Sequence, residues 1–285
     1  MPQLHGVVLT DTDMSDSPLN PLVMIGIGSS FAFSGLFYHL YQEKKKELQK
    51  LKEIPIFKPD QHLVKVLNAS LHKRLQYVAV EGLVQADGEP LTSQFVPRCS
   101  GVIQKIVVEE YWKYWNSVTG TWNSQTVNRK ETNNSVPFSL VCPGSYISDV
   151  FVKVQKPLDA SGCYLERVHL KVKRPEEGLV DIVVQGLSSQ KPVAMKESEE
   201  LLRVGTTMTG FGEVVLEGGQ VMRLQAPQDG RKYVLVPSDH RSFMDRHEAS
   251  ASMWKVLTAA TGITGASLLA NVLYNFFGKQ DDRSK

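Results

Sequence analysis

The sequence has few cysteines, the residues that could stabilise a fold by disulfide cross-links or bind a metal. It has three cysteines in 285 residues, which are too few for a disulfide-rich scaffold. Cys99, Cys142 and Cys163 are widely spaced, no Cys-x-x-Cys pair occurs, and no histidine lies close to any of them. Because a structural zinc site needs about four cysteine or histidine ligands, usually in close pairs, we expect no zinc site. In an oxidising compartment two of the three could pair, and the sequence does not say which.

The chain also lacks a large charge of either sign. Its net charge is +2, with 22% charged and 42% hydrophobic residues. These averages exclude a disordered chain, a collagen-like repeat and a nucleic-acid binder that works by bulk basicity. They are typical of a globular protein with one or two domains and a sizeable core.

Motifs for nucleotide binding or nucleophilic catalysis are missing as well. No P-loop and no Gly-x-Ser-x-Gly elbow occurs. Gly210-Phe211-Gly212 lacks the third glycine and the following helix of a dinucleotide site, so we predict a β segment bent at glycines. Ser238-Asp239-His240 has the residue types of a triad, but adjacent residues cannot form the relay, and we predict a helix N-terminus there. We therefore predict no catalytic, cofactor-binding or metal-binding residues in this chain, and no cofactor.

Two uncharged apolar segments near the ends depart from the average composition. Residues 22–41 and 256–277 contain no Asp, Glu, Lys or Arg. A helix of that length spans about 30 Å, the thickness of the hydrocarbon core of a bilayer. Tyr38 and Tyr41 end the first segment and Trp254 precedes the second, as expected at membrane surfaces. We predict two transmembrane helices, whose glycines and serines could also support an oligomer.

Two alternatives are helices buried in a soluble core and, for the first segment, a signal peptide. Soluble helices rarely lack charge over such a length, and residues 1–21 form an acidic tail without the Lys or Arg of a signal peptide. We therefore predict an uncleaved anchor. Lysines after the first segment would place the central region in the cytosol, whereas basic residues after the second oppose this, so the charges leave the orientation open.

The region between the two segments changes from helical to strand-like patterns. Residues 42–74 predict a basic helical stalk and linker, which either contacts anionic lipids or is solvated. Residues 75–237 predict a β-rich domain, followed by a juxtamembrane helix over 238–255 and, after the second span, a tail at 278–285. The predicted fold class is therefore an α+β membrane protein, with two transmembrane helices flanking a mainly β domain that has one or two helices.

Period-two patterns and turn signals place the elements of the central domain. A helix is predicted after Pro192, including residues 198–202 and ending before Gly205. A hairpin is predicted to turn at residues 217–220. Strands are expected at 77–84, 91–96, 102–111, 150–154, 164–172, 181–184, 206–216 and 221–224.

Three tryptophans lie around a predicted hairpin turn at residues 117–120. They could stack on nucleic acid or another ligand, but only Lys113 is basic within the cluster, and Glu109 and Glu110 lie nearby. We therefore expect a role in the core or in an interface, and no nucleic-acid partner. The three are Trp112, Trp115 and Trp122.

Short stretches spread over the chain form a combination that is more specific than any one of them. They are Glu81-Gly82 with Val84, Leu91-Thr92-Ser93-Gln94-Phe95-Val96, Cys99-Ser100-Gly101-Val102-Ile103-Gln104, Trp115-Asn116, Trp122-Asn123, Asn134-Ser135-Val136-Pro137-Phe138, Glu197-Ser198-Glu199-Glu200-Leu201-Leu202 with Val204-Gly205, Thr209-Gly210, Arg223-Leu224-Gln225 and Trp254-Lys255-Val256-Leu257. In order and spacing, from about residue 22 to 277, they resemble the family of mitochondrial ubiquitin ligase activators of NF-κB. These are RING-type E3 ligases, also called MULAN, MAPL or GIDE.

The resemblance implies a multi-pass protein of the mitochondrial outer membrane. Its central GIDE/BAM-like domain would face the intermembrane space, and both ends would face the cytosol. Partners would be the lipid bilayer and proteins of the outer membrane and intermembrane space. The family acts in protein ubiquitination or SUMO conjugation, mitochondrial dynamics, and innate immune and NF-κB signalling.

The sequence departs from the family after the second apolar segment. Family members continue into a cytosolic RING, which binds zinc and recruits a conjugating enzyme, whereas residues 278–285 contain no Cys or His. A RING needs eight such ligands, so we expect no ligase activity from this chain alone, and an E2 partner only if a RING is supplied elsewhere. The alternatives are an incomplete or spliced sequence and a RING-less scaffold or dominant-negative regulator.

Overall fold

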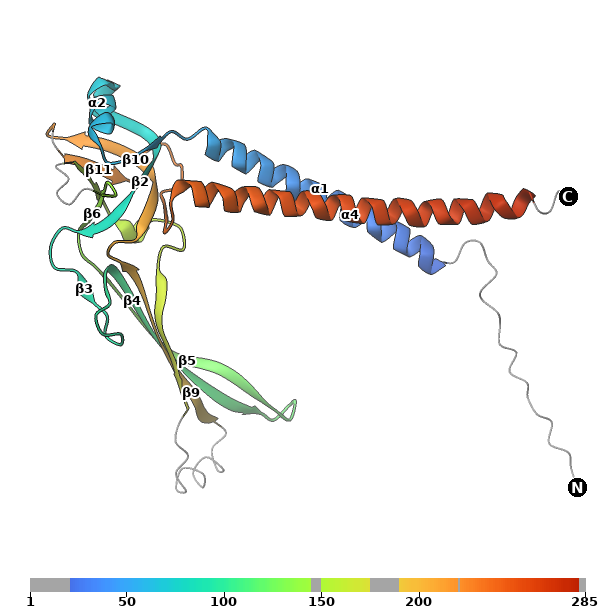
Figure 1. Cartoon of the computed structure of the whole chain (residues 1–285). Coiled ribbons are helices and arrows are strands. Elements are labelled where there is room, and N and C mark those ends of the chain that lie inside the picture. The colour runs from blue at the N-terminus through green and yellow to red at the C-terminus, as the bar shows by residue number, and fades with distance from the viewer. Residues whose placement is uncertain (1–20, 145–149, 175–189, 220, 282–285) are drawn as a thin grey trace, which may run out of the picture. The chain divides into compact units, whose positions relative to one another are not determined.

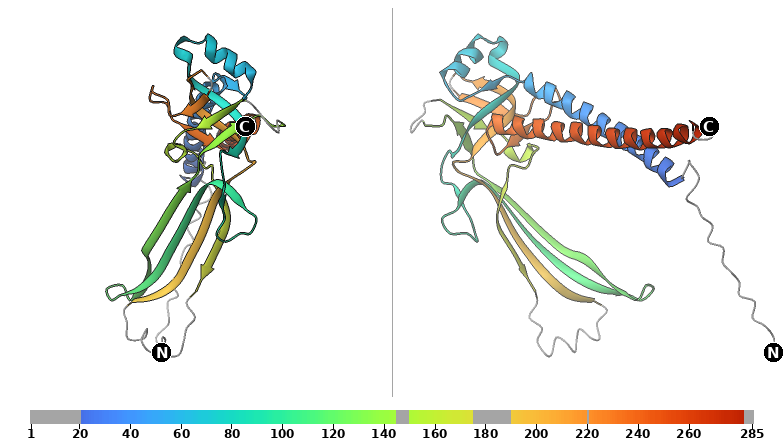
Figure 2. Two further views of the ribbon diagram at one scale, coloured as in Figure 1. Left: turned by 90° about the vertical axis from the view of Figure 1, so that its left-hand side faces the viewer. Right: turned by 45° about the vertical axis from the view of Figure 1, so that its right-hand side comes forward.

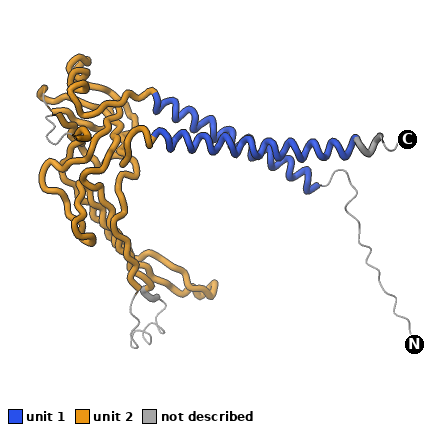
Figure 3. Tube along the Cα trace, viewed as in Figure 1, with its two compact units in different colours: residues 1–52, 244–285 blue, residues 53–243 orange. Residues whose placement is uncertain are grey.

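The computed structural model describes residues 21–144, 150–174, 190–219 and 221–281. The chain divides into two compact units, one within residues 1–52 and 244–285 and the other over residues 53–243 (Figure 3). The first unit is helical. It contains α1 (Pro21–Lys52) and all but the first residues of α4 (His240–Asp281). Both helices are long and apolar enough to cross a membrane, in agreement with the predicted fold class.

Small residues line the contact between α1 and α4. The Ser34 hydroxyl donates a hydrogen bond to the Thr258 carbonyl oxygen at 3.1 Å, and a Cβ added at Gly265 would lie 3.2 Å from the Cβ of Ser30. The Lys52 ammonium lies 2.6 Å from the Glu248 carboxylate at one end of the pair. Low-polarity surroundings favour such packing, because close backbone approach and interhelical hydrogen bonds replace the hydrophobic effect.

The second unit contains a small closed β-barrel. Seven strands follow the order β1-β2-β6-β7-β11-β10-β12, and an additional β2–β10 pairing closes the five strands from β2 to β10 into a ring. All pairings in the ring are antiparallel except the parallel β7–β11 pair. The strands are β1 (Ile56–Phe57), β2 (Arg74–Ala86), β6 (Phe138–Val141), β7 (Phe151–Val154), β10 (Thr207–Glu217), β11 (Val221–Gln225) and β12 (Val234–Val236).

Apolar side chains fill the barrel, and a short helix packs on it. Phe138 and Leu140 from β6 are 1% and 0% exposed, respectively. The helix α2 (Gln61–Ala69) adds the fully buried Leu63 and Leu67 to the same core. Its N-terminus is capped by Asp60, whose carboxylate accepts a hydrogen bond from the Leu63 amide at 2.9 Å. Two 3₁₀ turns, η1 (Leu71–Lys73) and η2 (Pro157–Asp159), lie in the connections.

The glycines of 210–212 have the predicted structural role. They lie in β10, and the register against β2 shifts between Gly212 and Val214. A Cβ added at Gly212 would lie 2.6 Å from the Gln225 carbonyl oxygen, so only glycine permits this approach.

The remaining strands form a second sheet that extends from the barrel. Figures 1 and 2 show β4, β5 and β9 running together as a long, curved arm. We call β4, β5, β8 and β9 the β arm; β4 is central, with β5 on one side and β9 then β8 on the other. The sheet consists of β3 (Leu91–Thr92), β4 (Ser100–Asn116), β5 (Thr121–Ser135), β8 (Glu166–Lys173) and β9 (Gln190–Arg203).

Several predictions of local structure differ from this fold. The helix predicted over 198–202 is wrong, because these residues lie in β9, between β4 and β8. Within the acidic run, Glu197 and Glu200 pair with Lys173 and Arg167 of β8, so tertiary pairing overrides local propensity. The strand predicted at 91–96 ends at Thr92, and α2 had no predicted counterpart. The hairpin predicted to turn at 117–120 is confirmed, because β4 and β5 pair on either side of that turn, but β5 extends to Ser135, well beyond the predicted hairpin. The strand predicted at 181–184 lies outside the described residues.

Other predictions are confirmed. β10 and β11 pair antiparallel as the predicted hairpin, with Glu217 opposite Val221. The helix after Ser238-Asp239 begins at His240, and the Asp239 carboxylate accepts a hydrogen bond from the Ser242 amide at 2.9 Å. The structure therefore assigns this tripeptide to a helix N-terminus.

Candidate functional site: the β arm

The described residues offer no metal centre. Across 21–144, 150–174, 190–219 and 221–281, no group of three or more His, Cys, Asp or Glu is placed to hold a metal ion. Cys99, Cys142 and Cys163 are all free thiols. That the chain uses no cofactor stays a prediction. The polar groups that do come together lie on the β arm.

A buried carboxylate lies at the root of the arm. Glu199 of β9 is 0% exposed and lies opposite Ile106 in the pairing of β9 with β4. Its oxygens accept hydrogen bonds from the Ser93 hydroxyl at 2.5 Å and the Gln104 amide nitrogen at 2.6 Å. The backbone amides of Gln94 and Phe95 donate to it at 3.0 and 3.4 Å. The carboxylate therefore holds the loop after β3 against the sheet.

The surroundings keep this carboxylate ionised. Burial raises the pKa of Glu199, but hydrogen bonds from Ser93, Gln104 and two backbone amides outweigh it, so the pKa lies below its usual value. General acid–base catalysis needs a carboxyl group that can reach a substrate and exchange a proton near the working pH. Glu199 does neither, so the geometry assigns it a positioning role.

Three of the stretches that carry the family resemblance meet at Glu199. The loop comes from the stretch 91–96, Gln104 ends the stretch 99–104, and Glu199 lies in the stretch 197–202. The Phe95 ring, in the same loop, stacks on His169 of β8 with ring centroids 4.4 Å apart. Sequence reasoning assigned no role to Glu199. The signal that it missed is the period-two spacing of Glu199 and Leu201, both of which are fully buried.

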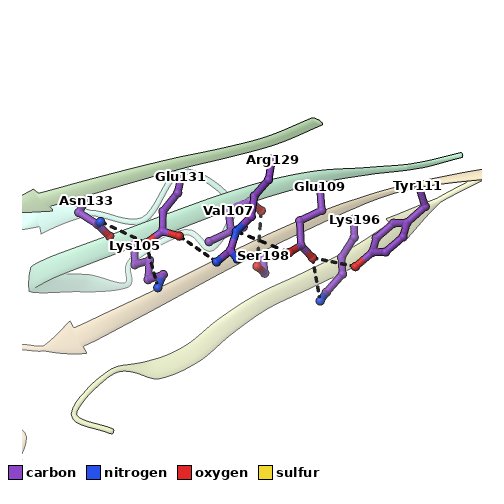
Figure 4. Close-up of polar contacts among 9 residues, drawn as sticks. All are labelled: Lys105, Val107, Glu109, Tyr111, Arg129, Glu131, Asn133, Lys196 and Ser198. Carbon is purple, nitrogen blue, oxygen red and sulfur yellow. Dashed lines mark hydrogen bonds and ion pairs between the residues drawn. The ribbon is translucent and has the colours of Figure 1, made fainter. Parts of the chain in front are cut away.

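A row of paired charges occupies the opposite face of the arm (Figure 4). Arg129 of β5 lies between two carboxylates, 2.9 Å from Glu131 and 3.7 Å from Glu109. Lys105 of β4 lies 3.0 Å from Glu131, and Lys196 of β9 lies 3.2 Å from Glu109. We call these five residues the polar face; they link β5, β4 and β9.

Hydrogen bonds shift the pKa values of groups on the polar face. The Tyr111 hydroxyl donates to Glu109 at 2.9 Å, and this bond, with that from Lys196, lowers the pKa of Glu109. The same bond raises the pKa of Tyr111. Hydrogen bonds from Lys105 and Asn133 lower the pKa of Glu131. The lowered pKa values keep Glu109 and Glu131 ionised at neutral pH, and the face is an ion-pair network.

The tryptophan hairpin forms the distal end of the arm. Trp115 and Trp122 are directly opposed on β4 and β5, with an edge-to-face contact and centroids 5.5 Å apart. They are 44% and 41% exposed, so of the two expected roles the core is wrong for this pair.

Comparison with known proteins gives the family. Residues 108–270 match the GIDE family model, described as E3 Ubiquitin ligase. The chain is 39% identical over 256 residues to Mitochondrial ubiquitin ligase activator of nfkb 1-A from Danio rerio, covering 90% of this chain and 73% of the relative. The chain belongs to the GIDE family of mitochondrial ubiquitin ligase activators of NF-κB.

Other members show the same extent of similarity. The chain is 34% identical over 257 residues to the human Mitochondrial ubiquitin ligase activator of NFKB 1, covering 90% of this chain and 72% of the relative. It is 25% identical over 256 residues to Mitochondrial E3 ubiquitin protein ligase 1 from Drosophila melanogaster, with the same shares covered. No solved structure matches the chain. The GIDE model includes Glu199 and most of the polar face and begins within β4.

Proposed function

We propose that this GIDE family member is a multi-pass protein of the mitochondrial outer membrane, with residues 53–243 in the intermembrane space and both ends in the cytosol. One observation carries the proposal: a β domain lies between two helices that can each span a membrane, in a chain that shares this region with mitochondrial relatives. An even number of spans places the two ends on one side and the domain on the other.

We further propose that these residues anchor and bind partner proteins within a ubiquitin ligase system but do not transfer ubiquitin themselves. RING chemistry needs a zinc-bound module with eight ligands, and the 285 residues contain three cysteines and seven histidines at wide spacing. A conjugating enzyme would therefore be recruited only through a RING supplied elsewhere. The family's roles in mitochondrial dynamics and in innate immune and NF-κB signalling are part of the same proposal.

A RING-less regulator that pairs with a RING-bearing relative is the second candidate. The small-residue contact between α1 and α4 favours it, because such contacts also permit helices of related chains to exchange. Such pairing would bring these residues, which contain no RING ligand set, into one assembly with the relative's RING.

A reconstituted reaction tests the absence of ubiquitin transfer. The full chain in lipid nanodiscs is mixed with E1, a set of E2 enzymes, ubiquitin and ATP, alongside a RING-bearing relative. The relative should form ubiquitin chains and this chain should form none. Self-ubiquitination by this chain would overturn the proposal. If adding this chain to the relative lowers the relative's activity, the regulator is favoured; unchanged activity supports a scaffold.

A further inference from the structure

The distal end of the β arm has a composition unlike the rest of the arm. We call residues 112–126, the ends of β4 and β5 and the turn between them, the aromatic tip. It holds three of the four tryptophans of the chain, one charged residue, Lys113, and no Asp or Glu. In register, β9 places Lys191 opposite Lys113, so the neighbouring strand adds a second lysine and no carboxylate.

The apex of the tip exposes apolar surface. Val118 is 92% exposed at the turn, and Trp115 and Trp122 just behind it are 44% and 41% exposed. Exposure of these apolar side chains to water is unfavourable, because removing their apolar surface from water would lower the free energy. We therefore infer that this apolar surface is a contact surface.

Three backbone amides of the turn are hydrogen-bonded within the turn itself. The Asn116 side-chain oxygen accepts hydrogen bonds from the amides of Val118 and Thr119 at 3.0 and 3.3 Å. The Gly120 amide donates to the Asn116 carbonyl oxygen at 2.9 Å, and the hydroxyls of Thr119 and Thr121 lie 2.8 Å apart. A loop that enters a region of low polarity needs hydrogen bonds of this kind, because each unsatisfied backbone group would cost several kcal/mol there.

Charge separates the tip from the remainder of the arm. On the polar face the carboxylates of Glu109 and Glu131 pair with the neighbouring cations, whereas the lysine of the tip has no carboxylate within the tip to neutralise it. Tryptophan prefers the water–membrane boundary, where its ring is in an apolar layer and its N–H remains hydrated. Lysine adds attraction to anionic lipid head groups.

We propose that the aromatic tip is a membrane-contact site that inserts Val118 and the Trp115–Trp122 pair at the head-group level of a bilayer and favours anionic lipids. A lipid surface fits better than a protein groove, since the turn amides already have partners and offer few directional contacts to specify a protein. The proposal does not depend on which membrane holds α1 and α4. The bilayer is either the one that anchors the chain or a second one that faces it.

Flotation with added vesicles tests contact with a second bilayer. The full chain is held in phosphatidylcholine nanodiscs and mixed with liposomes of phosphatidylcholine alone or with phosphatidylserine in equal parts. Val118→Asp places a charge at the apex without disturbing a packed side chain. Val172→Asp is the matched control, because Val172 is also exposed, at 56%, but lies on β8.

Tryptophan quenching tests contact with the anchoring bilayer. In a Trp254→Phe background every remaining tryptophan lies in the tip, so quenching by brominated lipid in the chain's own nanodisc reports on the tip alone. In at least one assay we expect contact that is stronger with anionic lipid, unaffected by Val172→Asp and reduced roughly tenfold by Val118→Asp. Absence of contact in both assays, or equal effects of the two variants, would overturn the proposal. Tip-dependent capture of a protein with no lipid contact would also overturn it.

Discussion

The barrel and the β arm belong to one compact unit, yet they are stabilised in different ways. The barrel strands turn one face inward onto Phe138, Leu140 and their neighbours, which are almost completely buried. In β4, Ile106 and Val107 point to opposite faces and are each 8% exposed, so the root of the arm is covered on both sides. Beyond Val107 every residue of β4 is at least partly exposed, and the sheet continues without a second layer.

This difference indicates how a sheet can extend beyond the hydrophobic core. A strand that is exposed on both faces specifies its register weakly, because a slip by one residue exchanges two similar faces. The polar face removes this ambiguity, since the cross-strand pairs Arg129–Glu109 and Lys105–Glu131 form only in the observed register. The core therefore stabilises the barrel, and paired charges select the alignment of the arm.

The largest effect should follow from opening the barrel core. Phe138→Ala removes a side chain that is 1% exposed, and we expect a loss of about 3–5 kcal/mol in the free energy of unfolding. Urea unfolding of the full chain in detergent, followed by circular dichroism, measures it. Leu170→Ala on β8, where Leu170 is 50% exposed, is the control and should cost about 1 kcal/mol or less. Equal losses would show that barrel and arm share one kind of stabilisation.

Removal of the buried charge at the root should have the next largest effect. Glu199→Gln presents an amide nitrogen to donors that need an acceptor, and we expect a cost of about 1–3 kcal/mol. Hydrogen exchange should show faster opening of the loop at 93–96. Glu197→Gln is the control, because Glu197 pairs with the half-exposed Lys173 at the arm surface. Unchanged hydrogen exchange at Gln94 and Phe95 would show that Glu199 does not hold this loop against the sheet.

Acid should weaken the same contact. The folded pKa of Glu199 lies below its unfolded value, so the unfolded state binds more protons in acid. The stability that the carboxylate contributes is complete above the unfolded pKa, near 4.3, and is lost as the pH falls through the folded pKa. Unfolding free energies measured from pH 6 down to about pH 3 should therefore fall less steeply in Glu199→Gln. Parallel curves would contradict the assignment, although Glu109 and Glu131 keep some acid sensitivity in both proteins.

The smallest effect on stability should come from the polar face. Arg129→Ala removes an ion pair whose arginine is 56% exposed, and we expect a loss of about 0.2–1 kcal/mol. The variant should instead change alignment, with a second set of cross-strand contacts between β4 and β5 in NMR spectra of the full chain. Lys130→Ala, one residue along β5, is the control. A single unchanged register in Arg129→Ala would show that the charges do not select it.

The sequence predicts the parts of this fold whose side chains repeat with a clear period. The two apolar helices, the β10–β11 hairpin and the helix after Asp239 follow from local patterns. Only the start of β5 follows from the predicted hairpin turn at 117–120; nearly all of its later residues are polar and exposed, and pairing with β4 alone makes them a strand. The acidic run in β9 has helical propensity that only its two neighbouring strands override.

The candidate site could not be predicted from the sequence, for a related reason. Glu199 meets donors that lie about one hundred residues earlier in the chain, and no local pattern predicts this meeting. The closure of the barrel likewise depends on a long-range β2–β10 pairing and on the parallel β7–β11 pair. The resemblance to the GIDE family supplied the relevant stretches, and the structure shows that three of them converge on one carboxylate.

Protease protection in intact mitochondria tests the central claim most directly. A short epitope is inserted after Gly88, an exposed turn position where an added Cβ would meet nothing within 4 Å. A second epitope is placed at the C-terminus. We expect added protease to remove the C-terminal epitope at once but to reach the internal epitope only after the outer membrane is ruptured. Digestion of the internal epitope in intact mitochondria would contradict it.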